Sequence, residues 1–218
     1  MAQNDEAMSA LEAPLADVAR QAIASARFDL TGPLHPHVTA ALTAGNKDVS
    51  AATLNAICHI VEQSVQTHRR LRIFSVVRKY PVLIQSDSSA APYVNGAMAA
   101  LETNVSMQFT IARMPTCRSV LSVSPMNEMI HDRTMNAINA GCVAILEDSP
   151  ASRAVFKHDR NALLFRYDDD SIAECLDIVC NQPERAFRIA QAGMKLRDDP
   201  RLRFGQFHNI LDLARRQK

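Results

Sequence analysis

A chain of 218 residues is long enough for one sizeable domain with an appendage, or for two small domains. Hydrophobic residues make up 47% of it and charged residues 22%, which is ordinary for a soluble globular protein. The formal net charge of +1 gives no reason to expect nucleic acid or a membrane surface as a partner.

The sequence was also searched for membrane spans, a secretory signal, and cysteines that form disulfides or bind metals. No apolar run approaches the roughly 20 residues that span a bilayer, so we expect no membrane span. The opening stretch MAQNDEAMSALEAP lacks the basic start and apolar core of a secretory signal. The 5 cysteines are odd in number and mostly lie in apolar segments, which indicates reduced thiols in a cytoplasmic protein. No pair has the spacing of metal ligands, so we expect no metal site.

The first 70 residues are expected to be helical. Apolar residues recur at helical spacing between residues 7 and 27, and a short helix is expected at 37–43. Ser50 is the expected N-cap of a long helix over 51–70, whose apolar stripe falls at spacings of three and four. That stripe comprises Leu54, Ile57, Cys58, Val61 and Val65. Residues 71–77 are compatible with a strand or with continued helix, and the spacing of their apolar residues favours helix.

From residue 81 onward, strands and helices alternate. The first strand is expected at 81–85, followed by a Ser- and Ala-rich loop and a short helix at 97–103. Residues 106–114 are compatible with strand or helix, and Met107, Ile111 and Met114 favour helix. Pro115 closes that segment.

The stretch from 118 to 148 has the pattern of a βαβ unit. Residues 120–123 and 142–146 are short, apolar and β-branched, which is typical of buried strands. Between them a helix over 131–140 is stopped by Gly141. Ligands of parallel sheets bind at the carboxyl ends of strands, beside helix N-termini. The expected ligand edge is therefore Ser124 to Arg133 together with Glu147 to Ser152.

The remaining elements are a short helix at 152–156, a strand at 162–165 and helices at 171–180, 184–197 and 201–216. The acidic run 168–170 is expected to cap the first of these long helices. The fold class is α/β: a Rossmann-like open parallel sheet preceded by a helical N-terminal region. The expected division is 1–70 for the helical region and 71–218 for the Rossmann-like domain.

Four pieces carry a family resemblance: CRSVLSVSP, HDRTMNAINAGCVAILED, DRNALLFRYDDDSIAECLDIV and PERAFRIAQAGMKLRDD. In this order they resemble the C-terminal, donor-binding domain of GT-B glycosyltransferases, in particular the group-1 transferases related to spore-maturation proteins. The resemblance implies that a nucleotide-diphospho-sugar binds between two Rossmann-like domains. It also implies glycosyl transfer without a metal or another cofactor, with the diphosphate facing a helix N-terminus.

The resemblance also points to residues. Retaining members carry a Glu-x7-Glu pair whose second Glu holds the donor ribose, and here Glu128 has that spacing to Asn136. Asn can hydrogen-bond a hydroxyl but carries no charge. Combined with the expected sheet edge, this gives the candidate substrate-binding residues Ser124, Glu128, His131, Arg133, Asn136, Glu147 and Asp148. No catalytic residue is assigned.

Structural roles for these residues stay open beside the functional ones. Arg133 is also compatible with a surface ion pair to Asp132 or Asp148. His131 could act as a general base or donate to a phosphate, but a bond to its own loop at the helix N-terminus is favoured over these roles. Glu147 and Asp148 are compatible with capping the helix that follows them.

Two departures from the family keep a second function open. The segment PVLIQSDSSAAPY has no Gly where phosphates need close backbone approach. No N-terminal Rossmann domain precedes residue 71, so we expect a fragment, or a partner domain or subunit that supplies the acceptor site, or a domain that no longer catalyses. The alternative is a non-catalytic, glycosyltransferase-derived interaction module that docks through its N-terminal helices. A nucleotide-binding protein of response-regulator type is disfavoured, because Asp87 is solitary after the first strand.

Overall fold

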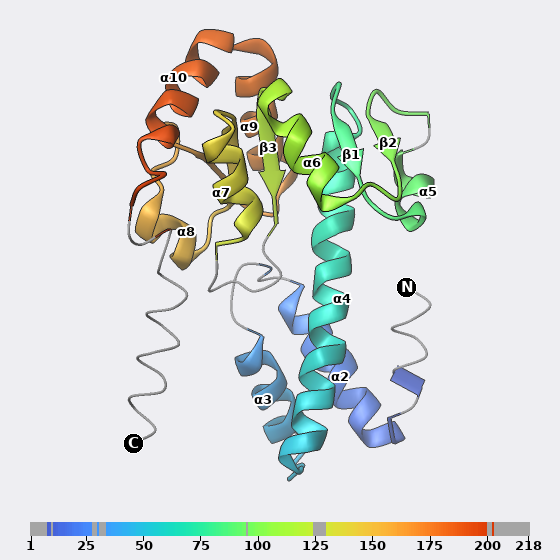
Figure 1. Ribbon diagram of the computed structural model, residues 1–218. Helices are drawn as coiled ribbons and strands as arrows, with labels where there is room; N and C mark the ends of the chain where they lie inside the picture. Colours follow the sequence, from blue (N-terminus) through green and yellow to red (C-terminus); the bar gives the residue numbers. More distant parts are fainter. Residues whose placement is uncertain are drawn as a thin grey trace. The chain divides into compact units, whose positions relative to one another are not determined.

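The computed structural model describes residues 8–9, 11–27, 30, 34–94, 96–123, 130–199 and 202 (Figure 1). Its contacts divide the chain into two compact units, Met1–Ile73 and Phe74–Lys218. The helix expected at 201–216 lies outside the described residues, except for Leu202. None of the helices in the described part has both the length and the apolar character that crossing a bilayer requires.

The first unit is helical, as predicted. It contains α2 (Ala13–Ala26), α3 (His35–Ala44) and most of α4 (Ala51–Val77). The Ser50 hydroxyl accepts a hydrogen bond from the Thr53 N–H at 3.2 Å, which confirms the expected N-cap. Because α4 runs on to Val77, the preference for continued helix over 71–77 is also confirmed.

The apolar stripe of α4 faces the interior of this unit. Ile57, Val61 and Val65 are each 0% exposed and form one cluster with the buried side of α2 and α3, while Leu54 and Cys58 pack against that cluster in partly buried positions. The stripe is therefore not available on the surface as a docking face.

The second unit opens with a two-stranded parallel sheet. It consists of β1 (Leu83–Gln85) and β2 (Ala100–Glu102), with Leu83 opposite Ala100, and the short helices η1 (Ser88–Ala90) and α5 (Ala91–Val94) lie between the strands. The prediction of a helix at 97–103 is thus wrong. Ala, Leu and Glu favour helix locally, but pairing with β1 decides the outcome here.

A helix then leads to the second sheet. It is α6 (Met107–Arg113), extended by the turn η2 (Met114–Thr116), and it confirms the preference for helix over strand in this segment. The Ser106 hydroxyl caps α6 by accepting the Phe109 N–H at 3.2 Å.

The βαβ unit predicted over 118–148 is present. It consists of β3 (Ser119–Ser122), α7 (Asp132–Asn139) and β4 (Val143–Glu147), and the strands are parallel. Gly141 follows α7 with φ +79°, a conformation that glycine adopts without strain and that ends the helix as expected. All five residues of β4 are buried, as suits a central strand.

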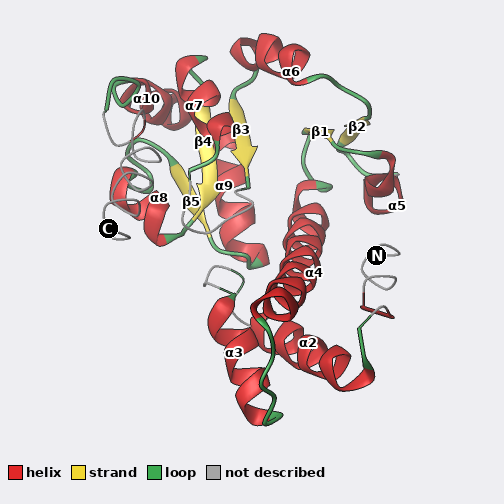
Figure 2. Ribbon diagram, turned by 60° about the horizontal axis from the view of Figure 1, so that its bottom comes forward, coloured by secondary structure: helices red, strands yellow, loops and turns green. Residues whose placement is uncertain are grey.

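The second sheet is completed by β5 (Leu163–Phe165), which pairs in parallel with β4 to give the order β3-β4-β5. The short helix α8 (Pro150–Val155) connects these two strands. Figure 2 shows the three strands side by side with helices around them. Among those helices, α7 packs on β3 and β4, α9 (Asp169–Asn181) on β5, and α10 (Pro183–Met194) on β4 and α7.

Side chains fix both ends of α9. The Asp168 carboxylate accepts the Ser171 N–H at 2.8 Å, which confirms the expected acidic N-cap. At the other end, Arg118 donates to the carbonyl oxygens of Val179 at 2.8 Å and Cys180 at 3.2 Å. A cation at a helix C-terminus is favourable, because it meets the negative end of the helix dipole.

The fold class is therefore the predicted one: a helical N-terminal region, then parallel strands with alternating helices, in a Rossmann-like α/β arrangement. The described strands form two separate sheets rather than one continuous sheet. All five cysteines are free thiols, as expected, although Cys117 is exposed rather than part of the core.

Candidate functional site

Two neighbouring strands of the second sheet end in buried polar residues. Ser122 ends β3 and Glu147 ends β4, and each residue is only 3% exposed. Both line a small hollow at the carboxyl edge of the sheet, which is too narrow in this structure to admit a water molecule. This is where ligands of open α/β sheets bind. The residues that line it are Ser122, Ile130, His131, Thr134, Leu146, Glu147 and Ser152.

His131 occupies the N-cap position of α7. Its Nδ1 accepts the Arg133 N–H at 3.1 Å and also closely approaches a carboxylate oxygen of Asp132. Burial, reinforced by the Arg133 charge, lowers the pKa of His131, and the Asp132 carboxylate opposes this shift only in part. We therefore infer a neutral imidazole near pH 7.

The hydroxyl groups of the hollow differ in how they are satisfied. Within the described part of the chain, the buried Ser122 Oγ has no hydrogen-bond partner. The hydroxyls of Ser149 and Ser152 bond to each other at 3.0 Å, and Ser149 Oγ also accepts the Ser152 N–H at 3.1 Å. Ser149, rather than Glu147 or Asp148, thus caps α8.

The structure brings two of the sequence-predicted residues together in the hollow, namely His131 and Glu147. Asp148, next to Glu147, instead pairs with Arg153 of α8 at 3.3 Å. The buried Glu147, which ends β4, and the partly exposed Asp148, which follows it, therefore have separate surroundings.

Two other predicted residues lie on α7 outside the hollow. Arg133 is exposed and Asn136 is half-buried, and they are three positions apart on one side of the helix. The buried Thr134 contributes to the lining instead. Ser124 and Glu128 lie outside the described residues. The structure therefore does not test whether Glu128 and Asn136 face the same ligand.

The candidate binding residues taken from the sequence did not include the three hydroxyl side chains of the lining, Ser122, Thr134 and Ser152, although Ser152 falls within the expected ligand edge. A signal for each was present. Ser122 is the last residue of a buried strand, and Thr134 and Ser152 each fall three residues after a helix N-cap. Side chains at such positions of neighbouring elements meet at the edge of a parallel sheet.

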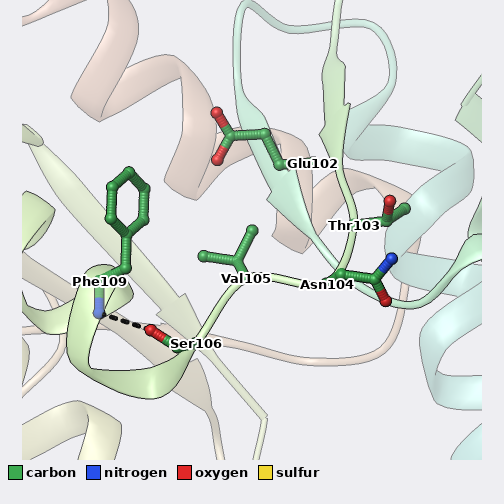
Figure 3. Close-up of a pocket in the computed structure, with 6 residues that line it drawn as sticks. All are labelled: Glu102, Thr103, Asn104, Val105, Ser106 and Phe109. Atoms are coloured by element: carbon green, nitrogen blue, oxygen red, sulfur yellow. Dashed lines mark hydrogen bonds between the residues drawn. The ribbon is translucent and has the colours of Figure 1, made fainter.

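A second, wider hollow lies at the end of β2, with about 780 Å³ of space that is largely open to solvent (Figure 3). Figure 3 shows the Glu102 carboxylate and the Phe109 ring on either side of it, with Val105 between them along the chain. Arg113 donates to both oxygens of Glu102 at 2.7 Å, and Gln85 donates to one at 3.3 Å. These hydrogen bonds lower the pKa of Glu102. Arg113 also lies 5.5 Å from the centre of the Phe109 ring.

The Glu102 charge of this wider hollow is thus balanced by Arg113, whereas the Ser122 hydroxyl of the small hollow has no partner among the residues that the structure describes. The small hollow is the better candidate site. Among the described residues, no group of three or more His, Cys, Asp or Glu side chains is placed to hold a metal ion.

Comparison with known proteins identifies the family of this chain. A model of a family described as glycosyl transferase-like matches residues 55–208, more than half of the chain. The matched region contains β3, α7 and β4, and with them every residue that lines the small hollow. No curated protein and no solved structure matches the chain. From the family match, which agrees with the Rossmann-like order of strands and helices, this chain belongs to the glycosyl transferase-like family.

Proposed function

We propose that this chain binds a nucleotide-diphospho-sugar at the carboxyl edge of β3 and β4. The observation that carries the proposal is the Ser122 hydroxyl, which is buried without a partner in the described part of the chain and lies on the wall of the hollow. An unpaired buried hydroxyl costs about 1–3 kcal/mol. A ligand that bonds to it recovers that cost, which supports a binding role for this edge.

Family membership supports the class of ligand. We propose that residues 71–218 act as the donor-binding half of a GT-B-type glycosyltransferase of the group-1, spore-maturation-like branch. In this proposal the glycosyl group passes to an acceptor held by another domain or subunit, and no metal takes part. The exposed Arg133 guanidinium, in the first turn of α7, would bind the diphosphate as a bidentate donor.

The other candidate residues are still proposed to bind the nucleotide-sugar, but the observations that support them differ. Glu147 and His131 are supported by their position in the hollow. Asn136 and Asp148 do not line the hollow and are proposed from their places in the sequence, on α7 and directly after β4. Ser124 and Glu128 are proposed from the sequence alone.

Calorimetric titration with UDP-, GDP-, ADP- and TDP-sugars tests the proposal. At least one of them should bind to the full chain in the millimolar range or tighter. Arg133→Gln should weaken that binding about 10–100-fold, because a charge-assisted hydrogen bond contributes roughly 1.5–3 kcal/mol. Arg160→Gln is the matched control, since Arg160 is also exposed but lies in the turn before β5. If none of the nucleotide-sugars binds, the proposal is wrong.

A second candidate function is an interaction module without catalysis. It is favoured by α6, which has no buried residue and exposes Met107 by 45%, Phe109 by 52% and Ile111 by 39%. Sedimentation velocity over a concentration series tests self-association through α6. A larger species that Phe109→Ser abolishes supports this function, whereas a monomer at every concentration argues against this form of it.

A further inference from the structure

We infer that the wider hollow at the end of β2 binds an uncharged carbohydrate of at least two rings. This site is separate from the edge of β3 and β4, and the inference does not depend on the nucleotide-sugar proposed there. It rests on the size of the wider hollow, on the charges and hydrogen-bonding groups of its lining, and on one exposed aromatic ring. The lining residues are Glu102, Thr103, Asn104, Val105, Ser106 and Phe109.

The wider hollow has room for a ligand as the structure stands. Water molecules can reach about 500 Å³ of it, which falls within the roughly 300–1,000 Å³ of pockets that hold small molecules. Figure 3 shows Phe109 at one end of the lining, Thr103 and Asn104 at the other, and Val105 between them. A ligand that contacts both ends is therefore elongated. Because the hollow is open to solvent, a longer chain can also extend beyond it.

The charges of the lining disfavour an ionic ligand. Among the residues that the structure describes, no Lys, Arg or His lines the wider hollow, so a phosphate or carboxylate would meet no cation of the lining. Glu102 is the acidic residue of the lining, and Arg113 donates to both of its oxygens at 2.7 Å. A cationic ligand would have to compete with this guanidinium for the carboxylate, whereas an uncharged ligand displaces nothing.

The Glu102 carboxylate still offers an acceptor. A carboxylate has about four acceptor positions. Within the described part of the chain, Arg113 donates to Oε1 and Oε2, and Gln85 donates to Oε2 at 3.3 Å. Oε1 therefore keeps a position for the O–H of a ligand. The hydrogen bonds that lower the pKa of Glu102 also keep it ionised at neutral pH, and an ionised acceptor makes the stronger hydrogen bond.

The other polar groups of the lining both donate and accept. Ser106 Oγ accepts the Phe109 N–H at 3.2 Å, so its own hydrogen remains to be donated. The exposed Thr103 adds a second hydroxyl, and the exposed Asn104 adds an amide with a donor and an acceptor. A sugar hydroxyl likewise both donates and accepts. It therefore matches this lining better than a ligand that only accepts.

Phe109 gives the wider hollow an apolar surface. Its ring is 52% exposed even though the Arg113 guanidinium lies 5.5 Å from its centre, so ring surface remains for a ligand. The face of an aromatic ring carries partial negative charge, which attracts the C–H groups on the face of a sugar ring. The hydroxyl groups of a sugar lie around its rim. Phe109 can thus contact the face of one sugar ring while the polar residues bind its rim and a neighbouring ring.

Saturation-transfer NMR with the full chain tests this inference at millimolar ligand concentrations. The probes are glucose, galactose, mannose and N-acetylglucosamine, each as the monosaccharide, the disaccharide and the trisaccharide. We expect at least one of these series to bind, and its disaccharide to bind tighter than its monosaccharide, because the lining has separate contacts at its two ends.

Two variants with matched controls locate the site. Phe109→Leu keeps an apolar side chain but removes the ring, and it should weaken binding about 2–10-fold, whereas Phe109→Tyr should retain the affinity. Asn104→Gly removes the amide at a φ of 58°, which glycine adopts without strain, so this variant should fold normally. It should also weaken binding about 2–10-fold. The controls are Phe187→Leu, at a ring 62% exposed on α10, and Asn46→Gly, at a φ of 49°. Both should leave binding unchanged.

Three outcomes overturn the inference. The first is that the unaltered chain binds none of these saccharides. The second is binding that both Phe109→Leu and Asn104→Gly leave unchanged, because the saccharide would then lie elsewhere on the chain. The third is equal binding of an uncharged peptide of alternating Gly and Ser, because the hollow would then lack selectivity for carbohydrate. The titrations with nucleotide-sugars decide the proposed function separately.

Discussion

The packing of α10 on the turn before β5 gives a prediction whose sign depends on one contact. Gly193 lies near the end of α10, and a Cβ placed there would stand 2.8 Å from the backbone carbonyl oxygen of Asn161. Ordinary contacts of a Cβ are 3.4–4 Å, so Gly193→Ala requires the helix or the turn to move by at least about 0.6 Å. The turn resists such movement, because the Asn161 side chain accepts the Lys157 N–H at 2.7 Å.

Two effects compete in this variant. Alanine in a helix is favoured over glycine by up to about 1 kcal/mol, and less near a helix end. Overpacking against backbone costs about 1–3 kcal/mol. We therefore expect Gly193→Ala to destabilise the second unit by about 1–2 kcal/mol, which corresponds to a Tm lower by roughly 2–8 °C.

Tyrosine fluorescence during urea unfolding measures this change. The chain has 3 Tyr and 0 Trp, and Tyr80, Tyr93 and Tyr167 all lie in the second unit. Gln191→Ala on the exposed side of α10 is the local control and should change stability little. Gly45→Ala is the matched glycine control, because the nearest atoms to its Cβ lie at 3.4 Å; circular dichroism should show it unchanged or slightly more stable. A Gly193→Ala chain as stable as the parent would refute the reasoning.

Three further predictions concern charged and capping groups. Arg118→Met should destabilise the second unit by about 1–2 kcal/mol, because it removes the donor that caps the C-terminus of α9; equal urea midpoints would contradict this. Burial lowers the pKa of His131, so its contribution to stability is present above the unfolded-state pKa near 6.5 and is lost as the pH falls through the folded-state value. His131→Asn, which caps without titrating, should therefore flatten the stability profile between about pH 7 and 5. The hydrogen bond from Arg185 lowers the pKa of Asp159, so the stability difference between the parent and Arg185→Gln should shrink as the pH falls below about 4, as urea titrations at several pH values will show.

The sequence was most informative where local and long-range preferences agree. Residues 142–146 are apolar and β-branched and lie between a glycine stop and a polar loop, so the central strand β4 could be predicted within one residue at each end. The strand β2 could not. Its three residues favour helix on their own, and they become a strand only because β1 lies alongside, which no local pattern records.

The residues of the candidate site likewise fall into those that the sequence predicts and those that it does not. His131 and Glu147 could be placed at the edge because each adjoins a predicted helix start or strand end. Which side of α7 faces the sheet depends on packing: Thr134 is turned inward, while Arg133 is exposed. Side-chain direction around a helix follows from the burial of its apolar face, and in this short helix only a few residues define that face.

The two sheets of the second unit differ in the burial of their strands, and therefore in how rigidly each sheet can hold a ligand. The β1–β2 pair has three residues per strand, none of them buried, whereas every residue of β4 is buried. A two-stranded sheet has only marginal stability on its own. We therefore expect the amide hydrogens of β1 and β2 to exchange with solvent, through local opening, faster than those of β4. The small hollow lies on the slowly exchanging strand. A ligand bound there would find its partners already in position, and little of its binding free energy would be spent on ordering the chain.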